Sequence, residues 1–257
     1  MWGSTFIFLG DSFFVEIYDK SQNMMGVAFV TREGQVLWQK DTDVIDSVGM
    51  DASHDLLAVG SLKNRHEGTL WAFSRSGDIL WTYDNPSRIK EVCVAADSSC
   101  VLFIDEEWYI HCIREGNLIW SDYILKKRGF GKRTIAFAPD SSYVVYGTEH
   151  PEPSLVASTL NGEKLWSHPI HEYIGTLAIS DDSQSIIVTS LAHVYKFTPD
   201  GNLVWDTNVG TNNDYIALTP SADFMAVGSN TLVSTFIILD GDGEVIWKKI
   251  FLIQYLQ

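Results

Sequence analysis

A five-residue motif recurs six times along the chain and constrains the fold more than any other feature. The motif is Gly, any residue, two residues that are mostly aliphatic, and then Trp. Its copies are Gly34–Trp38, Gly77–Trp81, Gly116–Trp120, Gly162–Trp166, Gly201–Trp205 and Gly243–Trp247. Successive Trp residues are 43, 39, 46, 39 and 42 residues apart. A period of about 40 residues is typical of a solenoid, a propeller or an array of repeats.

Each repeat has the pattern of four short strands separated by turn residues. Residues 45–84 contain an alternating run, a polar turn at Ser53 to Asp55, and the apolar stretch LLAVGS. A loop, LKNRHEG, then leads to the strand TLWAFSR, the turn SGD and the strand ILWTYD. Val, Ile, Phe, Tyr and Trp dominate these runs, as pleated and packed strands require. No stretch sustains the period of a helix.

Four antiparallel strands repeated six times predict a single all-β domain, a β-propeller of six four-stranded antiparallel blades. Seven blades are the alternative. We call the strands of a blade A to D, from the innermost to the outermost. The expected blades are residues 3–41, 45–84, 89–123, 132–169, 174–208 and 213–250, followed by an apolar tail or closing strand at residues 251–257.

The motif residues themselves are expected to build the scaffold. The Gly falls at the turn between strands C and D, where a positive φ favours glycine. The Trp falls on strand D, where its ring can pack against the neighbouring blade. Aspartates in the A-to-B turns can cap those turns with their side chains; they are Asp11, Asp97, Asp140 and Asp182.

The Gly-x-x-x-Trp unit resembles the repeat of pyrroloquinoline-quinone-type propellers, whose Trp docks between blades. A-to-B segments such as FAPDSSYVVYGT also resemble WD-repeat proteins. The resemblance covers nearly the whole chain and implies a propeller fold. The chain departs from the quinone dehydrogenases because it has no adjacent cysteines, and only fragments of their Ala-x-Asp element remain, as in TPDG and LDGDG. The resemblance therefore implies a member without enzymatic activity, and we expect no cofactor.

Composition narrows the classes of partner. The chain has 257 residues and a formal net charge of −15, which opposes general binding to nucleic acid. No apolar run approaches the roughly 20 residues that span a bilayer. The N-terminus lacks the positive segment and cleavage site of a signal peptide, which favours the cytoplasm; removal of a leader would instead imply an extracellular or periplasmic protein.

Of the three cysteines, Cys93 and Cys100 flank a tight turn and could form a disulfide bond, although small buried thiols are the simpler interpretation.

The basic segment Lys126 to Arg133 interrupts the regularity of the repeats. It holds five of the 18 basic residues, namely Lys126, Lys127, Arg128, Lys132 and Arg133, and lies in the longest D-to-A connection. The B-to-C loop with Lys63, Arg65 and His66 should lie on the same face of the propeller. We expect this face, conventionally the top, to bind a protein partner that carries an acidic segment or a phosphate; a solvated loop is the plainer interpretation.

No catalytic arrangement emerges from the remaining residues. No GxSxG nucleophile motif is present. His168 and His171 flank Pro169, which argues against a helical metal site, and no metal is expected there. Asp105, Glu106 and Glu107 are contiguous, so we expect an exposed turn rather than a glycosidase pair. Trp71 and Trp108 are expected to pack in the core, and an exposed aromatic there would mark a binding surface.

The sequence thus favours a non-catalytic scaffold for protein–protein contact, present as a monomer or as a dimer through the C-terminal tail. The alternative is a quinoprotein-like or sugar-active enzyme, or a ligand binder, that uses the central channel. The apolar character of the expected A strands, such as VCVAA and IALTP, argues against that alternative.

Overall fold

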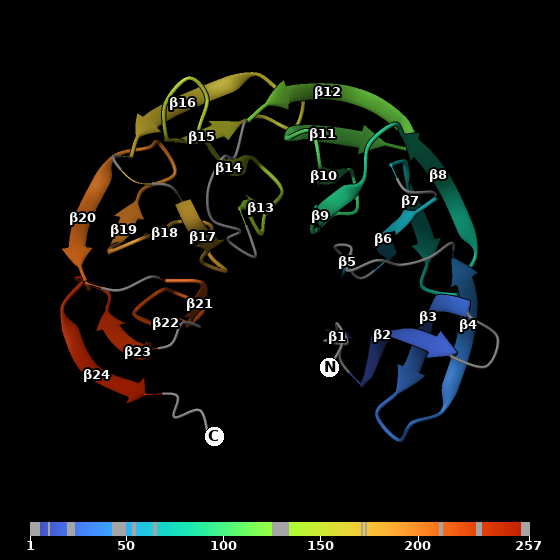
Figure 1. The fold of residues 1–257 in the computed structure, drawn as a ribbon, viewed down its shortest axis with the longest axis horizontal. Helices are drawn as coiled ribbons and strands as arrows, with labels where there is room; N and C mark the ends of the chain where they lie inside the picture. Colours follow the sequence, from blue (N-terminus) through green and yellow to red (C-terminus); the bar gives the residue numbers. More distant parts are fainter. Residues whose placement is uncertain are drawn as a thin grey trace. The chain divides into compact units, whose positions relative to one another are not determined.

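In the part of the chain that the computed structural model describes, strands joined by turns and short loops make up the fold. The described residues are 6–9, 11–19, 24–42, 50–52, 55–63, 66–124, 134–170, 172, 174–210, 213–229 and 233–252. They form 24 strands in six four-stranded antiparallel sheets, and in each sheet the strands pair in chain order (Figure 1). The all-β class and the count of six blades are therefore confirmed. Within the described ranges, no helix is long and apolar enough to cross a membrane.

The chain divides into two compact units, Met1–Asp122 and Tyr123–Gln257. The first unit contains three blades. The first blade comprises β1 (Phe6–Leu9), β2 (Ser12–Asp19), β3 (Met24–Thr31) and β4 (Val36–Thr42). The second comprises β5 (Met50–Ala52), β6 (Leu56–Leu62), β7 (Gly68–Ser74) and β8 (Ile79–Asn85). The third comprises β9 (Ile89–Val94), β10 (Val101–Asp105), β11 (Tyr109–Arg114) and β12 (Asn117–Tyr123).

The second unit contains the other three blades, and the single domain expected from the repeats stays a prediction. The fourth blade comprises β13 (Ile135–Phe137), β14 (Val144–Thr148), β15 (Ser154–Ser158) and β16 (Lys164–Pro169). The fifth comprises β17 (Ile174–Ile179), β18 (Ile186–Ser190), β19 (His193–Phe197) and β20 (Leu203–Asn208). The sixth comprises β21 (Tyr215–Leu218), β22 (Phe224–Gly228), β23 (Val233–Asp240) and β24 (Val245–Leu252).

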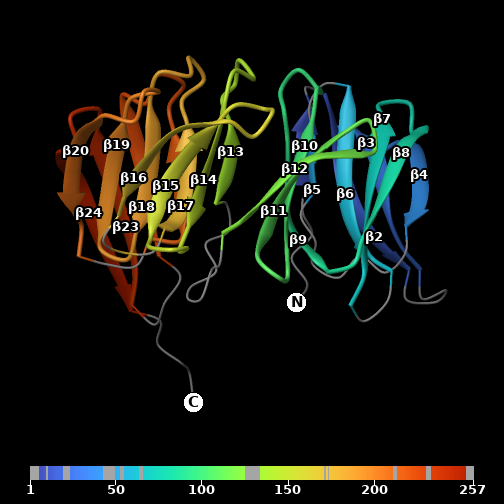
Figure 2. The same ribbon diagram turned by 90° about the horizontal axis from the view of Figure 1, so that it is seen from above.

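Apolar side chains between neighbouring sheets form the core of each unit. In the first unit, Phe14, Phe73 and Phe103 from three successive blades lie in one buried cluster. In the second unit, one cluster includes Val145 and Phe197, from the fourth and fifth blades. Strands of successive blades lie side by side within each unit, which is how each sheet covers the face of the next (Figure 2). The inner strands β6, β10, β14 and β18 are buried along nearly their whole length.

The motif glycines adopt the left-handed conformation that the C-to-D turn requires. Their φ angles are 85° at Gly34, 87° at Gly77, 76° at Gly116, 86° at Gly162, 82° at Gly201 and 85° at Gly243. In five blades the turn is closed by a side chain three residues before the Gly, which accepts a hydrogen bond from the amide that follows the Gly. The acceptors are Thr31, Ser74, Thr159, Thr198 and Asp240. This pattern is a type I turn followed by a left-handed residue.

Within each unit, the motif tryptophan of one blade lies against the C-to-D turn of the next blade. The indole N–H donates to the carbonyl two residues before the next motif Gly in three cases: Trp38 to Arg75 (2.8 Å), Trp166 to Pro199 (2.6 Å) and Trp205 to Gly241 (3.0 Å). The same rings lie so close to the glycine that a Cβ built at Gly77, Gly201 or Gly243 would meet the ring at 2.7, 2.5 or 2.6 Å. Only glycine fits beneath these rings without a shift of the neighbour.

The two aliphatic residues of the motif face solvent, contrary to their apolar character. Five blades have a register shift between strands C and D immediately before the Trp. The shift leaves one residue unpaired, as in a β-bulge. Both aliphatic side chains are consequently exposed, for example Val36 at 54% and Leu37 at 49%.

The A-to-B turns are closed by aspartate side chains, as the sequence predicts. Asp97, Asp140 and Asp182 each accept a hydrogen bond from the backbone N–H two residues later. The residue after each aspartate is a serine at a φ of 58° to 61°. Hydrogen bonds, first from the Ser142 hydroxyl, lower the pKa of Asp140.

The cysteines and the C-terminal tail are only partly as expected. All three cysteines are free thiols, with Cys100 and Cys112 buried, so Cys93 and Cys100 are not bridged. Phe251 and Leu252, expected in the tail, extend β24 and pair with Ser234 and Val233. The rest of the tail lies outside the described residues.

Candidate interaction surface at the B-to-C ends of the blades

The antiparallel order of each blade places two kinds of loop at one end. Strand B turns into strand C at that end, and the chain leaves strand D for the next blade from the same end. We call this end the B-to-C face and describe it separately for each unit. The A-to-B and C-to-D turns lie at the opposite end.

A buried aspartate anchors the B-to-C turn of the third blade. Asp105 ends β10 and is only 3% exposed, although the sequence suggested an exposed turn for this carboxylate. Its Oδ1 accepts a hydrogen bond from the Tyr109 N–H at 2.9 Å, and its Oδ2 lies 3.0 Å from His111 Nε2. Asn85, the last residue of β8, donates to the same Oδ2 at 3.3 Å. Asp105 therefore holds its own turn and also ties the third blade to the second.

His111 completes this network from strand C of the third blade. Its ring stacks on Phe103 with centroids 4.6 Å apart. Among the described residues, its buried Nδ1 has no hydrogen-bond partner.

Trp108 lies on the B-to-C turn above this anchor, in an unusual conformation. Its φ is 66°, in the left-handed region, which a bulky residue adopts at a cost of roughly 1–3 kcal/mol. Lys90 Nζ lies 5.3 Å from the centre of the ring and 3.6 Å from a carboxylate oxygen of Glu106. The neighbouring Tyr109 is 41% exposed. Two adjacent aromatic residues therefore stand at the B-to-C face, whereas the sequence pattern favoured core packing for Trp108.

The second blade presents the described part of the predicted basic patch. Lys63 Nζ forms an ion pair with Asp84 at 2.6 Å, and Thr69 also donates to that carboxylate. These contacts, led by the hydrogen bond from Lys63, lower the pKa of Asp84. The charge of Lys63 is therefore already balanced, while His66 is exposed.

The other members of the predicted patch lie outside the described residues. They are Arg65, Lys126, Lys127, Arg128, Lys132 and Arg133. Their role in partner binding stays a prediction. Trp71, by contrast, is described, and its indole N–H donates to Ser61 Oγ at 2.8 Å while its ring packs on the core, as expected.

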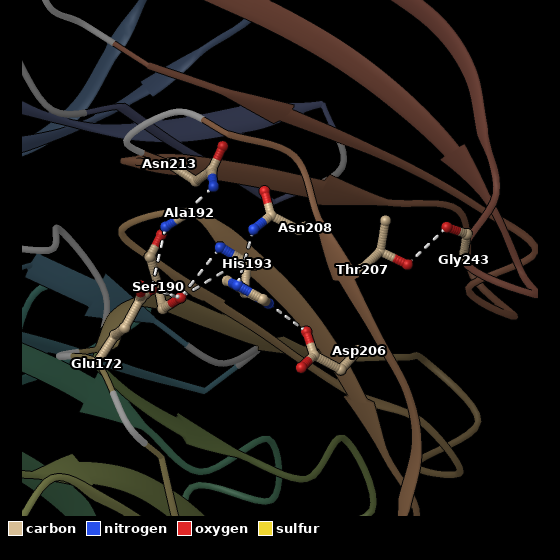
Figure 3. Close-up of polar contacts among 9 residues, drawn as sticks. All are labelled: Glu172, Ser190, Ala192, His193, Asp206, Thr207, Asn208, Asn213 and Gly243. Carbon is tan, nitrogen blue, oxygen red and sulfur yellow. Dashed lines mark hydrogen bonds and ion pairs between the residues drawn. The ribbon is translucent and has the colours of Figure 1, made fainter.

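In the second unit, a polar cluster occupies the B-to-C end of the fifth blade (Figure 3). Ser190, the last residue of β18, donates its hydroxyl to Glu172 Oε2 at 2.6 Å. The same carboxylate oxygen accepts the Ala192 N–H at 3.1 Å, and Asn213 donates to the Ser190 carbonyl at 3.3 Å. Glu172 and Asn213 belong to the connections before β17 and before β21. The cluster therefore ties the B-to-C turn to the D-to-A connections on either side of it.

His193, the first residue of β19, is held on both sides of its ring. Nδ1 lies 2.5 Å from Asp206 Oδ1, and Nε2 lies 3.1 Å from Asn208 Nδ2 (Figure 3). The ring also stacks on Tyr195, with centroids 5.7 Å apart. The hydroxyl of Ser190 bonds Glu172 and the backbone of His193 but not its ring. No activated nucleophile results, because nucleophilic catalysis needs the serine and the imidazole in contact.

Glu172 provides a pH test of this cluster. Burial raises the pKa of Glu172, but hydrogen bonds from Ser190 and Ala192 and the nearby His193 outweigh it and lower that pKa overall. A carboxyl with a depressed folded-state pKa stabilises the fold above its unfolded pKa of about 4.3, and this contribution is lost as the pH falls through the folded-state pKa.

We therefore expect Glu172→Gln to lower the free energy of unfolding at neutral pH and to converge with the wild type as the pH falls through the lowered folded-state pKa of Glu172. Urea unfolding at a series of pH values measures this difference. Glu163→Gln, at an exposed C-to-D turn residue, is the matched control and should leave the free energy of unfolding at neutral pH unchanged. An effect of Glu172→Gln that is constant with pH would contradict the role of the carboxylate.

The remaining candidate residues do not assemble a metal site in the described ranges, where no group of three or more His, Cys, Asp or Glu side chains could hold an ion. His168, near the end of β16, packs edge-on against Phe197 with centroids 4.8 Å apart. His171 lies outside the described residues.

Comparisons with solved structures place the fold among β-propellers. BamB from Moraxella catarrhalis matches with a TM-score of 0.66 and 16% identity, over 95% of this chain and 72% of that one. The C-terminal WD40 domain of Sif2 matches with a TM-score of 0.75 and 12% identity, over 94% and 69%. A structure of the eukaryotic initiation factor matches with a TM-score of 0.63 and 10% identity, over 97% and 78%.

Matches at these low identities establish the fold. The function has to be argued from the residues of the site. No protein-family model matches the chain. No curated protein matches it either. The resemblance to propellers of the WD and quinoprotein types is thus shown at the level of fold.

Proposed function

We propose that the chain is a non-catalytic scaffold for protein–protein contact and that the B-to-C face is its binding surface. The observation that carries this proposal is the turn of the third blade. A tryptophan held at a φ of 66° beside an exposed tyrosine is costly for folding, and strained residues cluster at functional sites. Trp and Tyr are also the residues that most often dominate the energy of protein interfaces.

The rigidity of the turn supports the same function. Asp105 binds three groups, from β8, β11 and the backbone of Tyr109, so the aromatic pair is presented on a fixed base. A fixed side chain loses little conformational entropy when a partner binds. Loops carried by a stiff array of sheets are a common platform for binding.

The titratable clusters favour a structural role over catalysis. In the fifth blade both nitrogens of His193 are engaged, and in the third blade His111 is held against buried Asp105. Within the described ranges, neither imidazole hydrogen-bonds to a serine or cysteine side chain that it could activate. This arrangement supports the scaffold over the enzyme alternative.

The substitution Trp108→Gly should weaken partner binding without destabilising the fold. Glycine adopts a positive φ at no steric cost, so we expect this variant to keep or raise the urea midpoint of the wild type. Loss of the ring should weaken binding by about 30-fold or more, the effect of an interface hot spot. Quantitative affinity capture from the source cells, with wild type and variant as baits, measures the loss.

Ser98→Gly is the matched control, because Ser98 has a φ of 61° on an A-to-B turn at the opposite end of the same blade. It should gain stability in the same way and retain every captured protein. Retention of the full set by Trp108→Gly would refute the proposed surface.

A further inference from the structure

A groove of about 750 Å³ lies between the first and second blades, at the end of the A-to-B and C-to-D turns. The first blade contributes Phe29, Leu37 and Trp38 to its lining, and the second contributes Asp55 and the turn residues 74–76. All of these residues are described and belong to the first unit. We call this feature the inter-blade groove. It opens to solvent at the end of the blades opposite to the B-to-C face.

The first blade gives the inter-blade groove an apolar wall. Leu37 is 49% exposed, because the β-bulge before the motif Trp turns it away from the sheet. The Trp38 ring is half-buried, and its indole N–H is already used by the Arg75 carbonyl at 2.8 Å. Phe29 lies beneath, only 3% exposed. An aliphatic side chain from a ligand would therefore bury the exposed parts of Leu37 and Trp38 against a firm base.

The second blade adds a positive charge that no carboxylate of the described residues balances. Arg75 is exposed, and its guanidinium carbon lies 5.8 Å from the centre of the Phe29 ring. The neighbouring hydroxyls are satisfied within the turn. Ser76 donates to Asp78 Oδ2 at 2.8 Å, which leaves Ser74 as the donor to Ser76, also at 2.8 Å. The guanidinium is thus the group in the turn that is left to bind an anion from solvent.

Docking of the blades requires the backbone of Arg75 but not its side chain. At the two junctions of the second unit, the equivalent carbonyls belong to Pro199 and Gly241. These carbonyls accept the indole N–H groups of Trp166 and Trp205, as Arg75 does for the first blade. Neither proline nor glycine carries a charge. The side chain of Arg75 is therefore free to serve a ligand without loss of the inter-blade contact.

We propose that the inter-blade groove binds an extended segment of a protein partner in which an aliphatic side chain stands next to Glu or Asp. The aliphatic side chain covers Leu37 and Trp38. The carboxylate pairs with Arg75, whose planar guanidinium matches two carboxylate oxygens. Asp55 also lines the groove, and it disfavours a phosphate there because the larger negative charge would be repelled more strongly.

Two capped tetrapeptides that differ by one charge test the proposal. The probes are acetyl-Gly-Leu-Glu-Gly-amide and acetyl-Gly-Leu-Gln-Gly-amide, titrated to millimolar concentrations into the full chain labelled with ¹⁵N. The indole N–H signal of Trp38, identified by its loss in Trp38→Phe, should move with both. The Glu peptide should bind about fivefold more tightly, the upper end for an exposed charge pair, and added salt should reduce this difference. No movement of the Trp38 signal, or equal dissociation constants, would overturn the proposal.

Variants of the groove assign the contacts. Arg75→Gln keeps the carbonyl that Trp38 uses, so the chain should fold as the wild type does in urea unfolding, and the two peptides should then bind equally. Lys164→Gln, which removes one exposed positive charge from β16 in the second unit, is the control and should keep the fivefold difference. Leu37→Ser should weaken both peptides alike. A difference that survives Arg75→Gln would overturn the proposal, as would tighter binding of a peptide with phosphoserine in place of Glu.

Discussion

Replacement of Trp166 by alanine should lower the free energy of unfolding by about 3 kcal/mol, near the lower end of the range for large aromatic side chains because the ring is only partly buried. The substitution removes the ring from the cluster between the fourth and fifth blades. It also removes the 2.6 Å hydrogen bond to Pro199 and leaves that carbonyl without this donor. Urea unfolding monitored by circular dichroism measures the change.

Leu165→Ala is the matched control for this substitution. Leu165 precedes Trp166 in the same motif but is 52% exposed. Its loss should cost less than about 1 kcal/mol. Equal losses at the two positions would show that docking on the next blade contributes nothing to stability.

Substitution of Gly201 by alanine should cost about 2–4 kcal/mol, since two penalties add. The φ of 82° is unfavourable for alanine, and the new Cβ would lie 2.5 Å from Trp166 Cδ2. Either the ring or the turn must move. The same urea experiment reports the loss.

Gly210→Ala separates the two penalties. Gly210 is also left-handed, with a φ of 70°, but the nearest atom to a new Cβ is Asn208 Oδ1 at 3.8 Å, an ordinary contact. Only the backbone cost of about 1–2 kcal/mol should remain. If the two alanine variants lose the same stability, the close approach of ring and glycine is not what restricts Gly201.

The architecture could be predicted from the sequence because the same pattern of four strands and a Gly-to-Trp motif occurs six times. Glycine at a left-handed turn and aspartate at an A-to-B turn are local requirements, so Gly77 and Asp140 could be assigned from their neighbours alone. A further local signal was available and missed. The hydroxyl or carboxylate three residues before each glycine, as at Thr198, closes the turn in five blades.

Other features depend on contacts between segments and could not be predicted. The exposure of Leu37 follows from a β-bulge between β3 and β4. The sequence around Leu37 is apolar and does not indicate that a bulge is present. Asp105 looked exposed in a run of three acidic residues, yet Asn85 and His111 bury it. The pairing of Lys63, just after β6, with Asp84 on β8 likewise depends on the sheet, in which β7 alone separates these two strands.

Trp108 shows the same limit at the candidate site. A tryptophan at the start of an expected strand is most often a core residue. The tight turn anchored by Asp105 instead requires a left-handed residue at that position. Glycine or asparagine would be the usual residue at a left-handed position. A tryptophan there conflicts with the local backbone preference, and conflicts of this kind are expected at functional positions.

Site-specific photo-cross-linking tests the central claim most directly. A photoreactive amino acid replaces Tyr109, exposed at the B-to-C face, or Ser98, on the A-to-B turn at the other end of the same blade. Irradiation in the source cells should produce a covalent adduct with another protein from position 109 and none from position 98. Adducts from position 98 alone, or from neither position, would contradict a scaffold that binds its partner at the B-to-C face.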